Sequence, residues 1–282
     1  MPEPTNSTIH LHDGRILGYA QYGISQGSAL FYFHGFPGSR FEARFLAAQA
    51  QQMGICLIGV DRPGLGLSTY KAGRRVLDWP DDVVELADYL HIDRFSVVGF
   101  SGGSPYALAC AYKIPGRLVA CGLVSGVGHV NRFQSFLSQW LPWIFFPITK
   151  RFFKDEMQAQ QTLERFASRW AESDQRSLLQ PGIKELMAAS LAEAFRQGAK
   201  GAAYDGTLLG GSWGFNLAEV GFPAVYLWHG ELDTESPVTT VRALVKDIPH
   251  FKATYYRHDS HISLIVNHKE EIVRTLMTLR SG

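Results

Sequence analysis

Short apolar runs alternate with segments of helical spacing along most of this 282-residue chain. Strands that are buried on both faces read as continuous apolar runs, and the helices that connect such strands cover both sides of the sheet. The alternation therefore predicts an α/β protein with a mostly parallel sheet and helices on both faces. The expected strands are residues 9–11, 16–22, 29–33, 55–60, 95–100, 118–125, 224–229 and 253–256, and the expected helices are residues 41–53, 77–90, 104–112, 237–248 and 262–279.

The alternation stops between residues 126 and 214. This part of the chain has helical spacing, is rich in Phe, Trp, Gln and Arg, and carries no strand signal. Its position between two expected strands predicts a helical cap, inserted into a core that residues 1–125 and 215–282 form. Basic residues flank its aromatic stretch at 140–153, and they indicate either the rim of an apolar acyl or aryl pocket or solvated charges on packed helices. These residues are Arg132, Lys150, Arg151 and Lys154.

The overall charge and composition narrow the expected partners. A formal net charge of +1 provides no global basic field for nucleic acid, so the expected partner is a small-molecule substrate. Cys56, Cys110 and Cys121 lie in apolar runs without metal or redox spacing, which predicts buried, reduced thiols. Residues 1–8 read as a short unstructured lead and not as a signal peptide, and no apolar stretch is long enough to span a bilayer. We therefore expect a cytoplasmic protein without stable membrane insertion, and the oligomeric state stays open.

A serine lies between an expected strand and an expected helix. The segment Gly99-Phe100-Ser101-Gly102-Gly103 follows the apolar run at 95–100 and precedes the helical run at 104–112. A serine on such a sharp turn points its hydroxyl away from the backbone, and the neighbouring glycines remove the Cβ atoms that would clash. The context predicts that Ser101 is a nucleophile.

The other reactive residues also follow expected strands. In open α/β sheets, ligands bind at the carboxyl ends of the strands, so these residues are expected to share one site. A serine hydroxyl needs a base, and a histidine base needs a carboxylate that fixes its tautomer. The chain order Ser101, Asp233, His261 fits this requirement. The alternatives are His258 for the base and Glu231 or Glu235 for the acid.

Five segments resemble, in the right order, motifs of the α/β-hydrolase fold superfamily, in the branch with a serine nucleophile and a helical cap. They are residues 34–38 (HGFPG, oxyanion loop), 61–68 (DRPGLGLS), 99–103 (GFSGG, nucleophile elbow), 227–233 (LWHGELD, acid turn) and 260–264 (SHISL, histidine loop). The resemblance covers nearly the whole chain and implies an eight-stranded, mostly parallel, twisted sheet with a helical cap insertion. The family usually has glycine at the position of Ser260.

The resemblance also implies roles for individual residues. Ser101 is the expected nucleophile, His261 the base and Asp233 the acid. The backbone N–H groups of Phe36 and Gly102 are the expected oxyanion hole, because Pro37 has no N–H to offer. No metal or organic cofactor is implied. Two further expectations concern structure: His34 holds its loop, and Asp61 and Arg62 form a structural ion pair or a loop clamp.

The expected activity is that of a serine hydrolase, of the carboxylesterase type, on a small to medium, largely apolar ester-like substrate. The alternatives are an aminopeptidase similar to proline iminopeptidases, a C–C bond hydrolase, or a ligand receptor without turnover on the same fold. The aminopeptidase would need acidic residues for a free amine, and the candidates in the cap are Glu172, Asp174 and Glu193.

Overall fold

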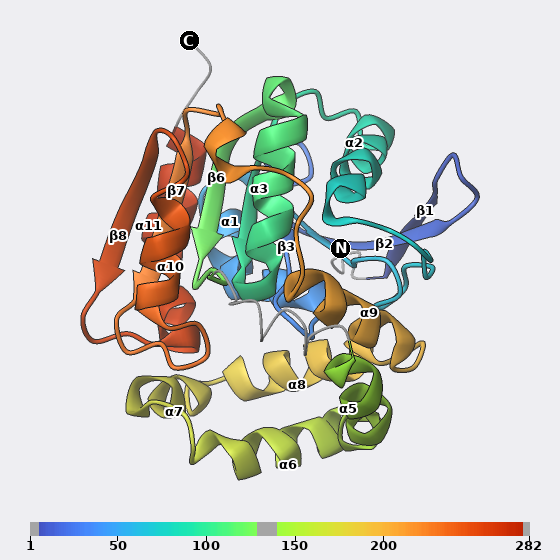
Figure 1. The fold of residues 1–282 in the computed structure, drawn as a ribbon, viewed down its shortest axis with the longest axis vertical. Coiled ribbons are helices and arrows are strands. Elements are labelled where there is room, and N and C mark those ends of the chain that lie inside the picture. The colour runs from blue at the N-terminus through green and yellow to red at the C-terminus, as the bar shows by residue number, and fades with distance from the viewer. Residues whose placement is uncertain (1–5, 129–139, 279–282) are drawn as a thin grey trace.

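The computed structural model describes residues 6–128 and 140–278. Eight strands form one sheet in the order β1-β2-β4-β3-β5-β6-β7-β8 (Figure 1). The pairs β1–β2 and β2–β4 are antiparallel and the other five are parallel, so the prediction of a mostly parallel, eight-stranded sheet is confirmed. The strands are β1 (Ser7–His10), β2 (Ile16–Gly23), β3 (Ser28–Phe33), β4 (Ile55–Val60), β5 (Phe95–Phe100), β6 (Leu118–Val124), β7 (Val225–Gly230) and β8 (Phe251–Tyr256).

Alternate residues of each central strand point to opposite faces of the sheet, and both faces are covered. On one face, Phe31 and Phe33 of β3 pack in a cluster with α2 (Trp79–Tyr89), α3 (Ser104–Lys113) and α10 (Val238–Val245). On the other face, Leu30 and Tyr32 pack with the 3₁₀ helix η1 (Arg40–Leu46), α1 (Ala47–Gln52) and α11 (His261–Thr278). Burial on both sides explains why these strands read as continuous apolar runs. Cys56, Cys110 and Cys121 are buried and free, as predicted.

Two elements begin differently from the expectation. The helix expected at 41–53 starts as η1, which Ser39 caps by accepting a hydrogen bond from the N–H of Phe41 at 3.4 Å. The tighter 3₁₀ turn brings residue 42 close to the cap, with its N–H bonded to the Ser39 carbonyl at 3.1 Å. Strand β1 begins at Ser7, inside the lead that was expected to be unstructured, because residues 7–10 pair with β2; residues 1–5 lie outside the described residues.

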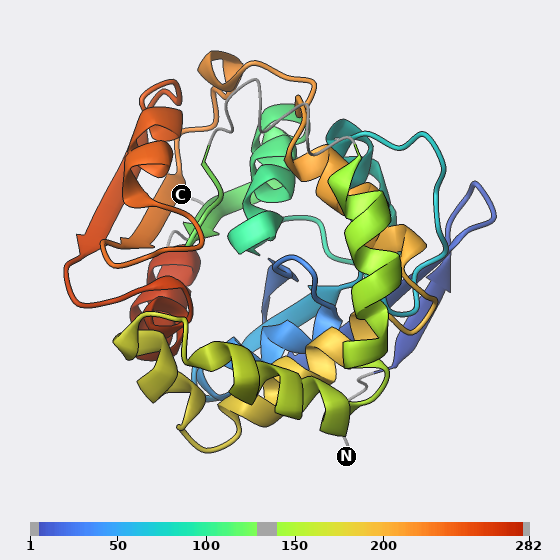
Figure 2. The same ribbon diagram turned by 60° about the horizontal axis from the view of Figure 1, so that its bottom comes forward.

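Between β6 and β7, the described residues form five α-helices, which lie across the carboxyl edge of the sheet (Figures 1 and 2). They are α5 (Leu141–Thr149), α6 (Glu156–Ala167), α7 (Glu172–Leu178), α8 (Ile183–Ala194) and α9 (Lys200–Leu209), and we refer to them as the cap helices. The described part of the 126–214 segment contains no strand. The limits of a separate cap domain stay a prediction. Over residues 6–128 and 140–278, no helix combines the length and the apolar character that a bilayer crossing requires.

Ion pairs join two cap helices to the core. Asp205 of α9 has no exposed surface and lies between two guanidinium groups, with Oδ2 2.8 Å from Arg62 Nη2 and Oδ1 2.6 Å from Arg74 Nη2. Glu193 of α8 contacts Arg40 Nη1 at 2.7 Å. A buried pair is costly to break, since removing one partner leaves an uncompensated charge away from water. The cap helices are therefore fixed to the core by charge as well as by apolar packing.

Replacement of Asp205 by alanine should destabilise the protein strongly. The variant leaves Arg62 and Arg74 buried without their shared carboxylate, and breaking a buried pair in this way costs about 3–5 kcal/mol. The matched control is Glu164→Ala, which removes the exposed contact to Lys184 at 2.6 Å and should cost no more than about 1 kcal/mol. Urea unfolding monitored by circular dichroism measures both, and equal midpoints for the two variants would contradict the role assigned to Asp205.

Candidate active site

Ser101 lies at the tip of a strained turn at the end of β5. Its φ angle is +50°, in the left-handed region that non-glycine residues rarely adopt. Two glycines allow this turn: a Cβ on Gly99 would lie 2.4 Å from the Gly103 carbonyl oxygen, and a Cβ on Gly103 would lie 2.1 Å from the Phe33 carbonyl oxygen. The turn continues directly into η3 (Ser101–Gly103) and α3. The structure thus has the strand, turn and helix expected around this serine.

His261 and Asp233 are hydrogen-bonded to each other. The loop after β7 carries Asp233, and His261 is the first residue of α11. The His261 Nδ1 atom is 2.8 Å from Asp233 Oδ2, and Asp233 Oδ1 accepts the N–H groups of Glu235 and Ser236 at 2.9 and 2.8 Å. Both carboxylate oxygens are therefore engaged, which fixes the orientation of the carboxylate and, through it, of the imidazole ring.

Charge balance around His261 favours its protonated form. Burial lowers the pKa of the imidazole, but the charge of Asp233 and its hydrogen bond act in the opposite direction, and the net pKa lies above the ordinary value of 6.5. Asp174 and Glu235 add to the upward shift. An imidazole placed in this way can take up a proton in the course of a reaction and keep it in a stabilised form.

The alternative acids and bases lie elsewhere. His258 is exposed on the loop after β8, and Glu231 pairs with Arg242 at 2.6 Å. Glu235 reaches the cavity described below, but only its backbone N–H contacts Asp233. The structure thus pairs His261 with Asp233, and it places His261 at the same cavity as Ser101.

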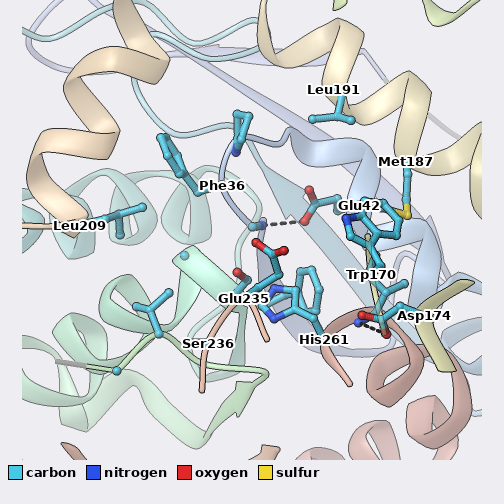
Figure 3. Close-up of a pocket in the computed structure, with 18 of the residues that line it drawn as sticks. Phe36, Glu42, Trp170, Asp174, Met187, Leu191, Leu209, Glu235, Ser236 and His261 are labelled. Atoms are coloured by element: carbon cyan, nitrogen blue, oxygen red, sulfur yellow. Dashed lines mark hydrogen bonds between the residues drawn. The ribbon is translucent and has the colours of Figure 1, made fainter. Parts of the chain in front are cut away.

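Ser101 and His261 line a cavity of about 530 Å³ between the carboxyl edge of the sheet and the cap helices (Figure 3). Most of its lining is apolar, and the side chains come from both the core and the cap; they include Phe36, Phe45, Phe100, Leu163, Trp170, Met187, Leu191, Leu209 and Ile262. Three carboxyl groups also face it, those of Glu42, Asp174 and Glu235.

The described lining contains no lysine or arginine. Lys150, Arg151 and Lys154 are exposed and do not line this cavity, which agrees with the alternative of solvated charges on packed helices. Arg132 lies outside the described residues. An apolar cavity with carboxyl groups and without facing cations is suited to neutral or cationic molecules and opposes anionic ones.

The backbone of Phe36 lies against the backbone of Gly102 at the cavity. A Cβ on Gly102 would lie 2.7 Å from Phe36 Cβ and 3.5 Å from the Phe36 nitrogen, so only glycine permits this approach. Residues 34–38 follow β3 and residues 101–103 follow the neighbouring strand β5, which explains why two loops distant in sequence meet here. Both N–H groups predicted for the oxyanion hole are thus neighbours.

The direction of the Phe36 N–H follows from the bonds to the preceding carbonyl. The Gly35 carbonyl oxygen, which belongs to the same trans peptide unit, is 2.8 Å from Arg62 Nη2 and 2.8 Å from His34 Nδ1. The carbonyl and the N–H of a trans peptide point in opposite directions. Since Arg62 and His34 hold the carbonyl on one side of the loop, the Phe36 N–H points to the other side.

Arg62 and His34 therefore act as a clamp on the 34–38 loop. Arg62 is fully buried and also donates to the His34 carbonyl, and His34 Nε2 accepts the Arg62 N–H at 3.2 Å. Burial, together with the charge of Arg62, lowers the pKa of His34 far below its usual range, so the ring is neutral and can donate from Nδ1 and accept at Nε2. The structural role expected for His34 agrees with these contacts.

Asp61 and Arg62 do not pair with each other. Asp61 contacts Arg40 at 2.7 Å, whereas Arg62 pairs with Asp205 of α9. The expectation of an ion pair between these two neighbours is thus wrong, because successive residues leave β4 in opposite directions, and the loop-clamp interpretation applies to Arg62.

Sequence reasoning missed two carboxyl groups beside the catalytic candidates. Glu42 of η1 accepts the Gly35 N–H at 2.6 Å, and burial raises the pKa of its carboxyl group to about 7. Asp174 of α7 accepts the N–H groups of Ile262 and Ser263 at 2.9 and 2.8 Å, at the start of the helix that His261 begins. From the sequence, Asp174 is only a candidate ligand for a free amine. Neither contact has a local sequence signal, because each joins residues that the fold brings together.

Comparison with known proteins places the fold in a family. Residues 30–275 match the model of the alpha/beta hydrolase family. A pimeloyl-(acyl-carrier protein) methyl ester esterase of Legionella pneumophila (strain Corby) is 26% identical over 256 residues, which are 87% of this chain and 91% of that protein.

Solved structures share the fold over nearly the whole chain. A thermophilic esterase from Thermogutta terrifontis superposes with a TM-score of 0.74 at 18% identity, covering 98% of this chain and 100% of that one. A hydrolase from Pseudomonas aeruginosa PA01 superposes with a TM-score of 0.73 at 17% identity, covering 96% of this chain and 98% of that one. Together with the family match over most of its length, these similarities show that the chain belongs to the alpha/beta hydrolase family.

Proposed function

We propose that this protein is a serine hydrolase of the carboxylesterase type, which cleaves a small to medium, largely apolar ester through an acyl-enzyme intermediate. The observation that carries the proposal is the pair Asp233–His261 at 2.8 Å, with the histidine and Ser101 lining the same apolar cavity. The esterase names of the Legionella and Thermogutta relatives support it.

In the proposed reaction, Ser101 Oγ attacks the ester carbonyl carbon and its proton passes to His261 Nε2. Asp233 holds the Nδ1–H and stabilises the imidazolium that forms. The carbonyl oxygen becomes an oxyanion, which accepts the N–H groups of Phe36 and Gly102. Collapse breaks the ester C–O bond, and His261 gives its proton to the leaving alcohol. Water then attacks the acyl carbon and gives a proton to His261. The bond from the acyl carbon to Ser101 Oγ breaks, His261 returns the proton to Oγ, and the carboxylic acid is released.

The surroundings of the acidic candidates do not favour an aminopeptidase. Glu172 pairs with Arg176 on the exposed side of α7, and Glu193 pairs with Arg40. Only Asp174 lines the cavity, and its Oδ1 already accepts two backbone N–H groups. Two of the three candidates are thus paired away from the cavity, which weakens the case for an aminopeptidase.

Loss of the Ser101 hydroxyl should abolish turnover. We expect Ser101→Ala to lower kcat/KM for p-nitrophenyl butyrate by at least about 10³-fold and to eliminate labelling by a fluorophosphonate probe, since no covalent intermediate can form. The exposed Ser168→Ala is the control and should match wild type. Equal activity of the Ser101 and Ser168 variants would refute the proposal, and ligand-dependent stabilisation without product would favour the receptor alternative.

The pH dependence of kcat/KM should reflect the protonation of His261. A general base acts in its neutral form, so kcat/KM should rise with pH through a midpoint above 6.5, because the pKa of His261 is raised. In Asp233→Asn the carboxylate charge is lost, so burial lowers the pKa of His261 and the midpoint should move to lower pH. The plateau value of kcat/KM should fall by about 10³–10⁴-fold. A midpoint that does not move in this variant would contradict the assignment of the pair.

The charge of the carboxyl groups at the cavity should affect which esters the protein hydrolyses fastest. We expect the neutral ester p-nitrophenyl butyrate to be hydrolysed with a kcat/KM at least about tenfold above that of the anionic p-nitrophenyl hemiglutarate, because carboxyl groups of Glu42, Asp174 and Glu235 face the cavity. Glu235→Gln should reduce the difference in kcat/KM between the two esters. A preference for the anionic ester would contradict this description of the cavity.

A further inference from the structure

The oxyanion loop is held on a second side by a buried glutamate. Glu42 is only 7% exposed, and its Oε2 accepts the Gly35 N–H at 2.6 Å, the contact drawn as a dashed line beside Glu42 in Figure 3. The loop is shaped around this carboxyl group, since a Cβ on Gly38 would lie 2.1 Å from Glu42 Oε1. The 34–39 loop thus folds back over the side chain that follows it in η1.

A serine of the cap reaches the same loop. Ser190 of α8 is 1% exposed, and its Oγ accepts the Ser39 N–H at 2.9 Å and lies 3.2 Å from the Ser39 hydroxyl. The Ser190 hydroxyl also donates to Glu42 Oε1 at 3.3 Å. One hydroxyl can donate once and accept twice, so these three contacts use its full capacity. Ser190 therefore links helix α8 to the end of the loop and to the glutamate inside it.

Together with the contacts of Arg62 and His34, these contacts fix the orientation of two successive peptide units. In the His34–Gly35 unit, Arg62 binds the carbonyl and Glu42 binds the N–H. In the Gly35–Phe36 unit, Arg62 and His34 bind the carbonyl, and the Phe36 N–H is left as the donor at the cavity. Without Glu42, the buried Gly35 N–H loses its acceptor, and rotation about the flexible Gly35 backbone re-aims the next N–H.

We propose that Glu42 and Ser190 are positioning residues of the oxyanion hole, and that the docking of helix α8 is what completes the hole. This inference rests on the proposed function. It goes beyond that proposal by assigning a catalytic consequence to a cap residue that does not touch the reacting atoms. Since oxyanion donors act on charge that appears only in the transition state, the effect should fall on kcat and not on KM.

The test compares Glu42→Ala, Glu42→Gln and Ser190→Ala with Ser177→Ala. Ser177 is a matched control because it is equally buried in the cap, and its hydroxyl donates only to the Ser173 carbonyl within its own helix at 3.0 Å. With p-nitrophenyl butyrate we expect kcat to fall by about 10²-fold in Glu42→Ala and about tenfold in Ser190→Ala, with KM changing less than about threefold. Glu42→Gln keeps an oxygen acceptor and should stay within about fivefold of wild type.

A second measurement separates the oxyanion hole from general binding. An alkyl trifluoromethyl ketone forms a bond from Ser101 Oγ to its carbonyl carbon, the Ser101 proton passes to His261, and the ketone oxygen becomes an oxyanion. Its affinity, followed by ¹⁹F NMR, should weaken in parallel with kcat in Glu42→Ala and Ser190→Ala. The affinity of the alcohol with the same alkyl chain should not change. If Glu42→Ala fails to fold, Ser190→Ala and Glu42→Gln carry the comparison.

The outcomes distinguish the two proposals. A wild-type protein that neither turns over esters nor binds the ketone through Ser101 would overturn both. An active wild type whose Ser190→Ala variant matches Ser177→Ala in kcat would overturn only the positioning role. The same conclusion would follow if ketone and alcohol lost affinity equally, because that would indicate a general change of the cavity.

Discussion

The buried guanidinium of Arg62 joins the parts of this molecule that must act together. It binds the His34 and Gly35 carbonyls in the loop after β3 and pairs with Asp205 of the cap helix α9 at 2.8 Å. Arginine suits this position because its planar group offers several donors in fixed directions. The charge of Asp205 makes the burial tolerable, and Arg74 and the Tyr106 hydroxyl share the same carboxylate. Arg62 thus both orients the loop after β3 and attaches the cap helix α9 to the core.

The cap helices take part in the site at several places. Asp174 of α7 caps the start of α11 beside His261, Ser190 of α8 contacts the end of the 34–39 loop, and Asp205 of α9 anchors Arg62. Each contact reaches a different member of the proposed catalytic machinery. The helices also supply much of the apolar wall of the cavity. Removal of the cap would therefore alter catalytic geometry as well as substrate selection.

The sequence predicts the sheet well, and it singles out the candidate residues, because both kinds of signal are local. The apolar runs of the core strands reflect burial on both faces, and Ser101, Asp233 and His261 each lie within a recognisable motif. The contacts of Glu42, Asp174 and Ser190 could not be predicted, since they join segments 7 to 151 residues apart in the chain. The pairing of Asp61 with Arg40 and of Arg62 with Asp205 was missed for the same reason: neighbours in sequence turn to different partners in space.

The central claim is that Ser101 carries the acyl group during turnover. Rapid acid quench of the protein mixed with excess p-nitrophenyl butyrate, followed by digestion and mass spectrometry, tests it most directly. The account predicts one butyryl group on the peptide that contains Ser101, and none in Ser101→Ala. Steady turnover with no acylated peptide, or with the acyl group on another residue, would contradict it.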